Sequence, residues 1–182
     1  MRCPMPTLVR AVADDRDGLI AFLEEQRASL RRAVHGLDDE QAAARPVPSS
    51  ELCLGGLVKH VANAERNWVD VVAGRPSPAR DWSSEFGMAP EETLADLLTR
   101  YRKISDETAA VFAGISDLDR PLDIGPLSAL IPSGTERTPR WVLSHLIQET
   151  ARHAGHADIL REALDGSTAA DLLQATGTPL FG

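Results

Sequence analysis

Residues 138–164, TPRWVLSHLIQETARHAGHADILREAL, form the longest amphipathic stretch of the chain and decide its fold. Their apolar residues recur at a helical period. The packing positions are Trp141, Leu143, Leu146, Ile147, Ala151, Ile159 and Leu160. We expect the helix to begin at Thr138, with Pro139 in its first turn, and to stop before Gly166. The tail beyond this glycine is expected to be short, polar and only partly ordered.

Three further helices are predicted upstream of this stretch. Apolar residues recur at a helical period over residues 14–35, 54–73 and 90–113. Acidic residues lie near the start of the first and third segments, and glycines follow the ends of all three. These are the residues that typically start and stop a helix.

The segments between the predicted helices are loops of unequal length. Residues 77–89, which include Trp82, are expected to form a loop. The longest connection, residues 115–138, is rich in Pro, Gly, Asp and Ser and is expected to hold short extended pieces around Leu127–Ile131. Four amphipathic helices with one long crossover connection before the last predict an all-α four-helix bundle. We expect residues 1–182 to form a single domain.

Composition and charge argue against several classes of function. The chain has 182 residues, of which 43% are hydrophobic, 25% charged and 4% aromatic, as in a helical globular domain. A net charge of −8 argues against nucleic acid as a partner, because phosphate binding needs a basic surface. No apolar stretch approaches the roughly 20 residues that span a bilayer, so we expect no membrane partner. Cys3 and Cys53 indicate no disulfide framework, which favours a reducing, cytoplasmic location.

Three residues with metal-binding side chains lie on one side of the predicted C-terminal helix. Glu149 and His153 are four residues apart, and His156 follows three residues later. A carboxylate and imidazoles that converge in this way can hold a divalent ion such as zinc. In helical bundles a further ligand comes from a facing helix, and His60, among apolar positions of the second predicted helix, is the best candidate. His145 could extend the row of ligands by one turn.

The pattern leaves the metal and the chemistry open. Two histidines and one carboxylate can hold zinc, nickel or ferrous iron, and three protein ligands plus water describe an open catalytic zinc site. Such a site would activate water for hydrolysis or a small-molecule thiol for transfer. The same spacing also fits an exposed helix without metal. Glu149 would then pair with Arg152 or His153, and His60 would be a histidine packed in the core.

Three segments carry a resemblance to a known family. Residues 141–166, WVLSHLIQETARHAGHADILREALDG, look like the signature of the DUF664 group of the DinB-like superfamily. Residues 54–68, LGGLVKHVANAERNW, resemble another block of that group, and residues 36–50 are similar as well. The resemblance covers most of the chain, and it implies a DinB-like four-helix bundle with a metal held by three side chains.

The chain also resembles the N-terminal domain of mycothiol-dependent maleylpyruvate isomerase. In that family the zinc set is one His on the second helix and a Glu-x-x-x-His pair on the last. The positions that match are His60, Glu149 and His153. Many DinB-like proteins carry His at the position of Glu149, so this chain follows the isomerase-like pattern. His156, where other members often have Gln, is then expected to face the substrate or to support a ligand.

The resemblance favours a zinc-dependent transferase that acts on a small molecule with a low-molecular-weight thiol such as mycothiol. A metal-dependent hydrolase, with His156 as its proton shuttle, and a non-catalytic bundle stapled by metal are the alternatives. Asn63 and Asn67, on the face of His60, and Arg140, at the end of the long connection, are expected to bind the thiol cofactor or substrate. Solvent-facing roles are the alternative for all three. A homodimer through helix faces is compatible with so small a bundle.

Overall fold

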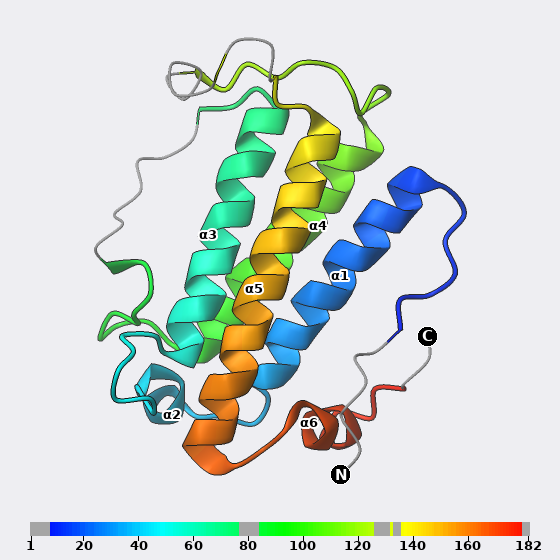
Figure 1. Cartoon of the computed structure of the whole chain (residues 1–182). Coiled ribbons are helices and arrows are strands. Elements are labelled where there is room, and N and C mark those ends of the chain that lie inside the picture. The colour runs from blue at the N-terminus through cyan, green and yellow to red at the C-terminus, as the bar shows by residue number, and fades with distance from the viewer. Residues whose placement is uncertain (1–7, 77–83, 126–131, 133–135, 180–182) are drawn as a thin grey trace.

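The described residues fold into a bundle of four long helices with two short helices attached (Figure 1). This computed structural model describes residues 8–76, 84–125, 132 and 136–179. In chain order the helices are α1 (Asp15–Ala33), α2 (Asp39–Ala43), α3 (Leu54–Val72), α4 (Leu94–Ala113), α5 (Pro139–Asp165) and α6 (Ala169–Ala175). No β-strand occurs within those described ranges, and the predicted all-α bundle is confirmed.

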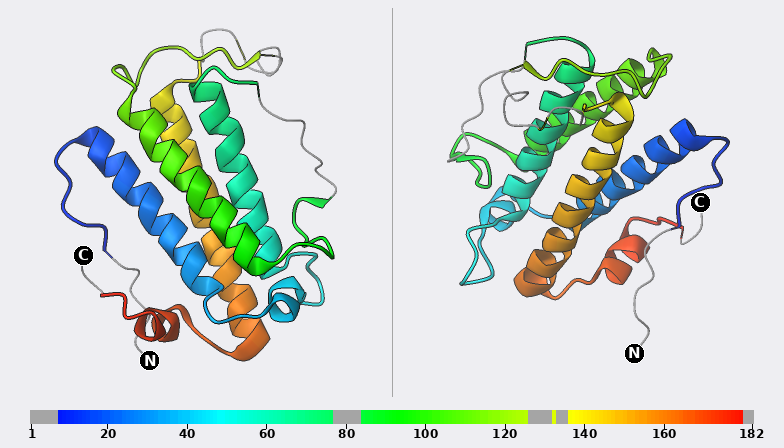
Figure 2. Two further views of the ribbon diagram at one scale, coloured as in Figure 1. Left: turned by 180° about the vertical axis from the view of Figure 1, so that it is seen from behind. Right: turned by 45° about the horizontal axis from the view of Figure 1, so that its top comes forward.

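The long helices pack on one another in a fixed order. α1 packs against α5, α5 against α3, and α3 against α4. Figure 1 shows α5 between α1 and α3, and the view from behind in Figure 2 brings α4 to the front. The described parts of the long connection from α4 to α5 lie across the top of the bundle in Figure 1. The extended pieces expected around Leu127–Ile131, and the loop residue Trp82, fall outside the described residues.

Side-chain caps fix where the long helices begin. Asp14, Cys53, Thr93 and Thr138 each accept a hydrogen bond from the backbone N–H three residues later. Such a cap satisfies one of the backbone donors that have no partner within a helix. The helix predicted from residue 90 therefore begins only at Leu94, because the cap is Thr93 and not a residue before Pro90.

The two short helices, α2 and α6, were not expected from the sequence pattern. Each begins with a capping box, formed by Asp38 and Gln41 in α2 and by Thr168 and Asp171 in α6. α6 packs against α1 and buries its leucines, so the expectation of a polar, partly ordered tail is wrong for this segment. α2 packs against α3 near the start of that helix and buries its Ala42 there (Figure 1).

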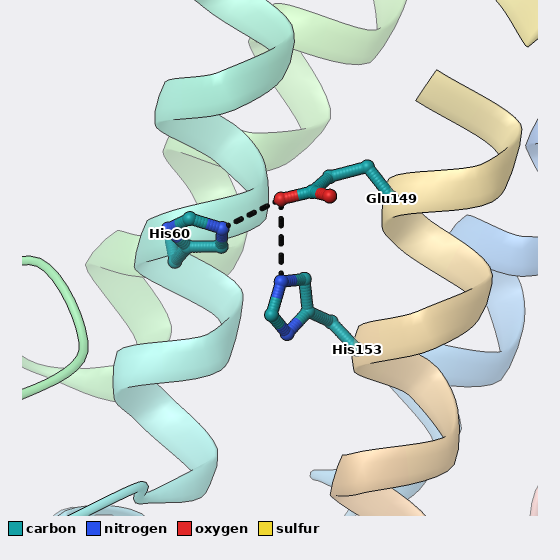
Figure 3. A group of neighbouring side chains, drawn as sticks. All are labelled: His60, Glu149 and His153. Carbon is teal, nitrogen blue, oxygen red and sulfur yellow. Dashed lines mark hydrogen bonds and ion pairs between the residues drawn. The ribbon is translucent and has the colours of Figure 1, made fainter. Parts of the chain in front are cut away.

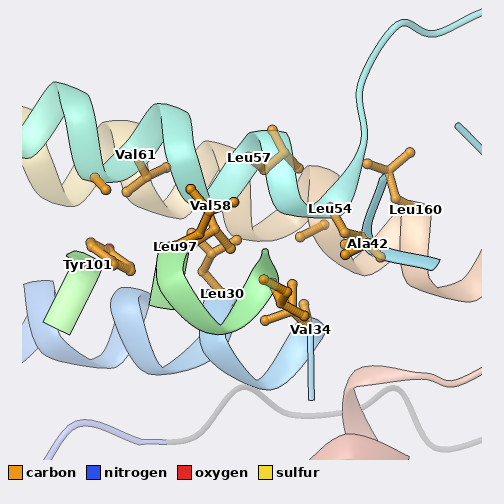
Figure 4. Packing of buried hydrophobic residues seen from close by; sticks show 14 of the residues in the cluster. Leu30, Val34, Ala42, Leu54, Leu57, Val58, Val61, Leu97, Tyr101 and Leu160 are labelled. Carbon is orange, nitrogen blue, oxygen red and sulfur yellow. The ribbon is translucent and has the colours of Figure 1, made fainter. Parts of the chain in front are cut away.

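Apolar side chains fill the bundle in two clusters. The first includes Leu30, Leu57 and Tyr101 and lies toward α2 (Figure 4). The second includes Phe112 and Leu143 and gathers at the other ends of the long helices. Among the described residues no helix is both long and apolar enough to cross a membrane.

Candidate metal centre

Two neighbouring helices bring three potential ligands together. α3 supplies His60, and α5 supplies Glu149 and His153, one turn apart (Figure 3). Glu149 Oε1 lies 2.9 Å from His60 Nε2 and 3.3 Å from His153 Nε2. Both histidines are buried, whereas the side chain of Glu149 is 23% exposed. The residues that the sequence analysis selects as ligands are thus in contact, and the carboxylate is the member that solvent reaches.

The spacing of the donor atoms fits a divalent metal ion. One ligand atom from each of the three side chains lies within 4.8 Å of the others. A tetrahedral zinc site with ligand bonds of about 2.0–2.1 Å separates its donors by about 3.3 Å, close to the two distances from Glu149 Oε1. Over the part of the chain that the structure describes, no other group of three or more such side chains converges in this way. Three protein donors leave a coordination position for a further ligand.

The electrostatics of the cluster favour the protonation states that bind metal. Burial lowers the pKa of His153, and the neighbouring His60 lowers it further, so the ring is neutral at neutral pH. Burial raises the pKa of Glu149, but the hydrogen bond from His60 and the charges of both histidines outweigh burial and bring the net pKa below its usual value. A neutral imidazole and an ionised carboxylate are the forms that coordinate metal.

His156 lies beside the cluster but outside the set of converging donors. Its Nδ1 is 3.3 Å from Nδ1 of His153, the ring nitrogen opposite the one that faces Glu149. The residue is half-buried. This position suits the support of a ligand, and it also suits the exchange of protons with solvent.

The remaining candidates on α3 and α5 have other partners. Asn63 accepts a hydrogen bond from Arg100 of α4, and Asn67 lies half-buried one turn further along α3. The ring of His145 stacks on Trp141, with centroids 4.9 Å apart, and burial lowers its pKa. His145 is therefore a packed ring one turn from the cluster.

The structure does not bring Arg140 to the cluster. Arg140 precedes Glu149 by nine residues, which is about 13 Å along a helix. Its guanidinium lies 2.7 Å from Asp119 of the long connection and also pairs with Asp15 at the start of α1. These ion pairs tie the start of α5 to the connection and to α1.

The loop before α4 adds two residues that the sequence analysis does not predict at the site. The ring of Phe86 stacks on that of His60, with centroids 4.2 Å apart. Glu85, which is 2% exposed, places Oε1 3.9 Å from His60 Nδ1. Neither residue belongs to a helix, so no periodic pattern marks them.

The start of α3 is built to receive this loop. A Cβ atom on Gly56 would lie 1.9 Å from the carbonyl oxygen of Phe86, so only glycine allows the loop backbone to come so close. Cys53 Sγ lies 3.6 Å from the same oxygen, and Lys59 Nζ donates to the carbonyl of Gly87 at 3.2 Å. The Gly55-Gly56 pair is the one signal in the sequence that could have pointed to a close approach here.

Comparisons with known proteins match this architecture. The family model described as mycothiol-S-transferase matches residues 18–166, a span that contains His60, Glu149 and His153. A conserved protein from Enterococcus faecalis has a similar structure, with a TM-score of 0.66 over 86% of this chain and 100% of that chain. At 13% identity this likeness shows the fold alone. No curated protein matches the sequence. Since the family match covers most of its length, the chain belongs to the mycothiol-S-transferase family, a DinB-like family.

Proposed function

We propose that the protein is a metal-dependent transferase that joins the sulfur of mycothiol, or of a similar low-molecular-weight thiol, to an electrophilic small molecule. His60, Glu149 and His153 would hold the metal, with zinc preferred to nickel or iron. The observation that carries the proposal is the convergence of two buried histidines and one carboxylate in a chain of this family.

A metal bound by these three residues would lower the pKa of a coordinated thiol, so that the thiol ionises near neutral pH. Glu149 would offset part of the charge of the ion. Because Glu149 is the exposed member of the set, we expect thiol and substrate to approach from its side. Phe86 stacks on the imidazole of His60 and covers one face of this ring.

Thiol transfer requires a group that accepts the thiol proton and passes it to solvent. The thiol gives up its proton, its sulfur forms a bond to an electrophilic carbon, and the leaving group departs with the electron pair of the broken bond. His156 is our candidate to carry the thiol proton to solvent, because it is half-buried and contacts His153. No buried acid is needed for this route.

Metal content and thiol consumption test the proposal. Elemental mass spectrometry of the untagged protein should find about one metal ion per chain, and His60→Gln and Glu149→Gln should lose it. His35→Gln, which changes an exposed histidine at the end of α1, is the matched control and should keep the metal. The loaded protein should then consume mycothiol when an alkylating electrophile is supplied.

Each alternative predicts a different result. Hydrolysis of an ester or amide without added thiol would favour the metal-dependent hydrolase. Metal bound without any turnover would favour the metal-stapled bundle, although the present set of three donors suits an open site better than a closed one. Absence of metal from the wild type after reconstitution with zinc, nickel and iron would refute the proposal.

A further inference from the structure

The two ring nitrogens of His60 face two different carboxylates. Nε2 lies 2.9 Å from Glu149 Oε1, and Nδ1 lies 3.9 Å from Glu85 Oε1. Among the described residues Nδ1 has no hydrogen-bond partner, although it is buried. A buried ring nitrogen that faces a buried carboxylate without a hydrogen bond is costly, and this calls for an explanation in terms of the bound state.

We propose that Glu85 is a positioning residue that holds the His60 proton on Nδ1 and so leaves the Nε2 lone pair to the metal. The proposal rests on the metal centre described under Proposed function. Histidine ligands of metals commonly donate their second N–H to a carboxylate or carbonyl, which fixes both the tautomer and the orientation of the ring. Glu85 is the acidic residue on that side of His60.

The distances fit a change of tautomer between the metal-free and metal-bound protein. Without a metal, Nε2, which lies 2.9 Å from Glu149 Oε1, would donate to that carboxylate, and Nδ1 would present its lone pair to Glu85. The gap of 3.9 Å exceeds a normal hydrogen bond by about 1 Å, as expected for a lone pair facing a carboxylate. With a metal held at Nε2, the ring proton would move from Nε2 to Nδ1, and Nδ1–H would donate to Glu85.

Glu85 can fix His60 only if its loop is itself held in place. Phe86 stacks on the imidazole, and its backbone lies against Gly56 in a gap that admits no Cβ. Lys59 holds the same loop through the carbonyl of Gly87 and through Glu92, whose Oε2 lies 2.8 Å from Nζ. The loop is therefore anchored to α3, the helix that carries His60. This anchoring fixes the position of the Glu85 carboxylate relative to the His60 ring.

The second histidine of the set is supported differently. His153 presents its Nδ1 to Nδ1 of His156, a half-buried imidazole 3.3 Å away. The side chain that faces Nδ1 of His60 is instead the almost fully buried Glu85, whose carboxylate oxygens are hydrogen-bond acceptors. Nδ1 of His60 and Nδ1 of His153 therefore face different partners, and we expect a fixed tautomer only for His60.

The zinc affinity of Glu85→Gln tests the proposal. The substitution keeps the shape of the side chain and removes its charge, and we expect zinc binding to weaken by about 10–100-fold in competition with a chromophoric chelator. Glu91→Gln is the matched control, because it removes the charge of an exposed glutamate that also precedes α4 and leaves both the anchors of the loop and the carboxylate that faces His60 unchanged. Its zinc affinity should equal that of the wild type.

A nuclear magnetic resonance measurement on the wild type provides a readout that does not depend on any variant. Long-range ¹H–¹⁵N correlation of the zinc-loaded protein should show His60 coordinated through Nε2, with a proton on Nδ1. Coordination through Nδ1, unchanged zinc affinity in Glu85→Gln, or equal weakening in Glu91→Gln would each overturn the role of Glu85. If the wild type does not bind zinc, both the metal centre and the role of Glu85 are refuted. If it binds zinc but transfers no thiol, only the proposed transferase activity is refuted.

Discussion

The buried ion pair between α1 and α3 offers a stability prediction that can be worked from the structure. Arg27 Nε lies 3.1 Å from Glu65 Oε2, and the exposed fractions of the two side chains are 4% and 1%. Thr108 of α4 donates a further hydrogen bond to the same carboxylate. Arg27→Met keeps most of the apolar length of the side chain but leaves the Glu65 carboxylate buried with only Thr108 as a partner among these residues.

Removal of one member of a buried pair costs about 3–5 kcal/mol, because the other charge is left without compensation. The urea midpoint of the metal-free protein should therefore fall by roughly 1–2 M, given the usual dependence of unfolding free energy on urea. The double variant Arg27→Met/Glu65→Leu removes both charges, and its free energy of unfolding should lie close to that of the wild type. The pair of Arg27 with Glu24 contributes little to this difference, since Glu24 is half exposed.

Equilibrium urea unfolding, followed by circular dichroism, measures all four proteins of this cycle. A loss below about 1 kcal/mol in Arg27→Met would mean that Glu65 finds water or a proton in place of Arg27. A double variant as unstable as the sum of the two single variants would mean that packing, and not the uncompensated charge, sets the cost. Either result would refute the reasoning.

Three further predictions follow from the site. Zinc at 100 times its dissociation constant should raise the free energy of unfolding by about 2.7 kcal/mol, and His60→Gln should lose this gain in urea titrations with and without zinc. Gly56→Ala should displace Phe86 and weaken zinc binding in a chelator competition, because its Cβ would lie 1.9 Å from a carbonyl oxygen; an unchanged affinity would show that the loop does not position His60. Because burial holds the pKa of His145 below 6.5, the unfolded chain binds that proton first, so stability falls as the pH drops below about 6.5. His145→Gln should flatten this fall in urea titrations of the metal-free protein, and an identical pH profile would contradict the assignment.

The long helices could be predicted because each repeats its apolar residues over at least about five turns. α2 and α6 have five and seven residues, too few for a period to stand out. Their signal is local: the capping boxes that begin at Asp38 and Thr168 are visible in the sequence once a short helix is considered. The start of α4 shows the same limit, since Pro90 and Thr93 both suit a helix start and only the hydrogen bond to Thr93 decides between them.

The contacts of the candidate ligands could be predicted for a related reason. Glu149 and His153 share a helix face by their spacing, and the apolar neighbours of His60 turn it inward. Glu85 could not be found in this way, because its place depends on how a loop folds back onto α3. Arg140 was expected at the site but pairs with Asp119. This contact joins two distant parts of the chain, and no local sequence pattern predicts it.

The two apolar clusters leave a polar layer at the middle of the bundle. Arg27, Glu65 and Thr108 lie between the clusters on their own helices, and Glu149 and His153 occupy the corresponding stretch of α5. Buried polar groups are costly unless they are paired, and the ion pair is satisfied with or without metal. The His–Glu–His set is held by two hydrogen bonds to a single carboxylate oxygen, and a metal can replace both.

This arrangement separates the folding of the bundle from the binding of the metal. The apolar clusters and the ion pair fix α3 relative to α1 and α4, so His60 has a defined position before any metal arrives. α5 then presents the carboxylate and the second imidazole in contact with His60. In small zinc domains, by contrast, binding and folding are the same event. We therefore expect the metal-free protein to keep its helices, and the metal to act as a ligand of the folded state whose affinity depends on how well Glu85 and the loop hold His60.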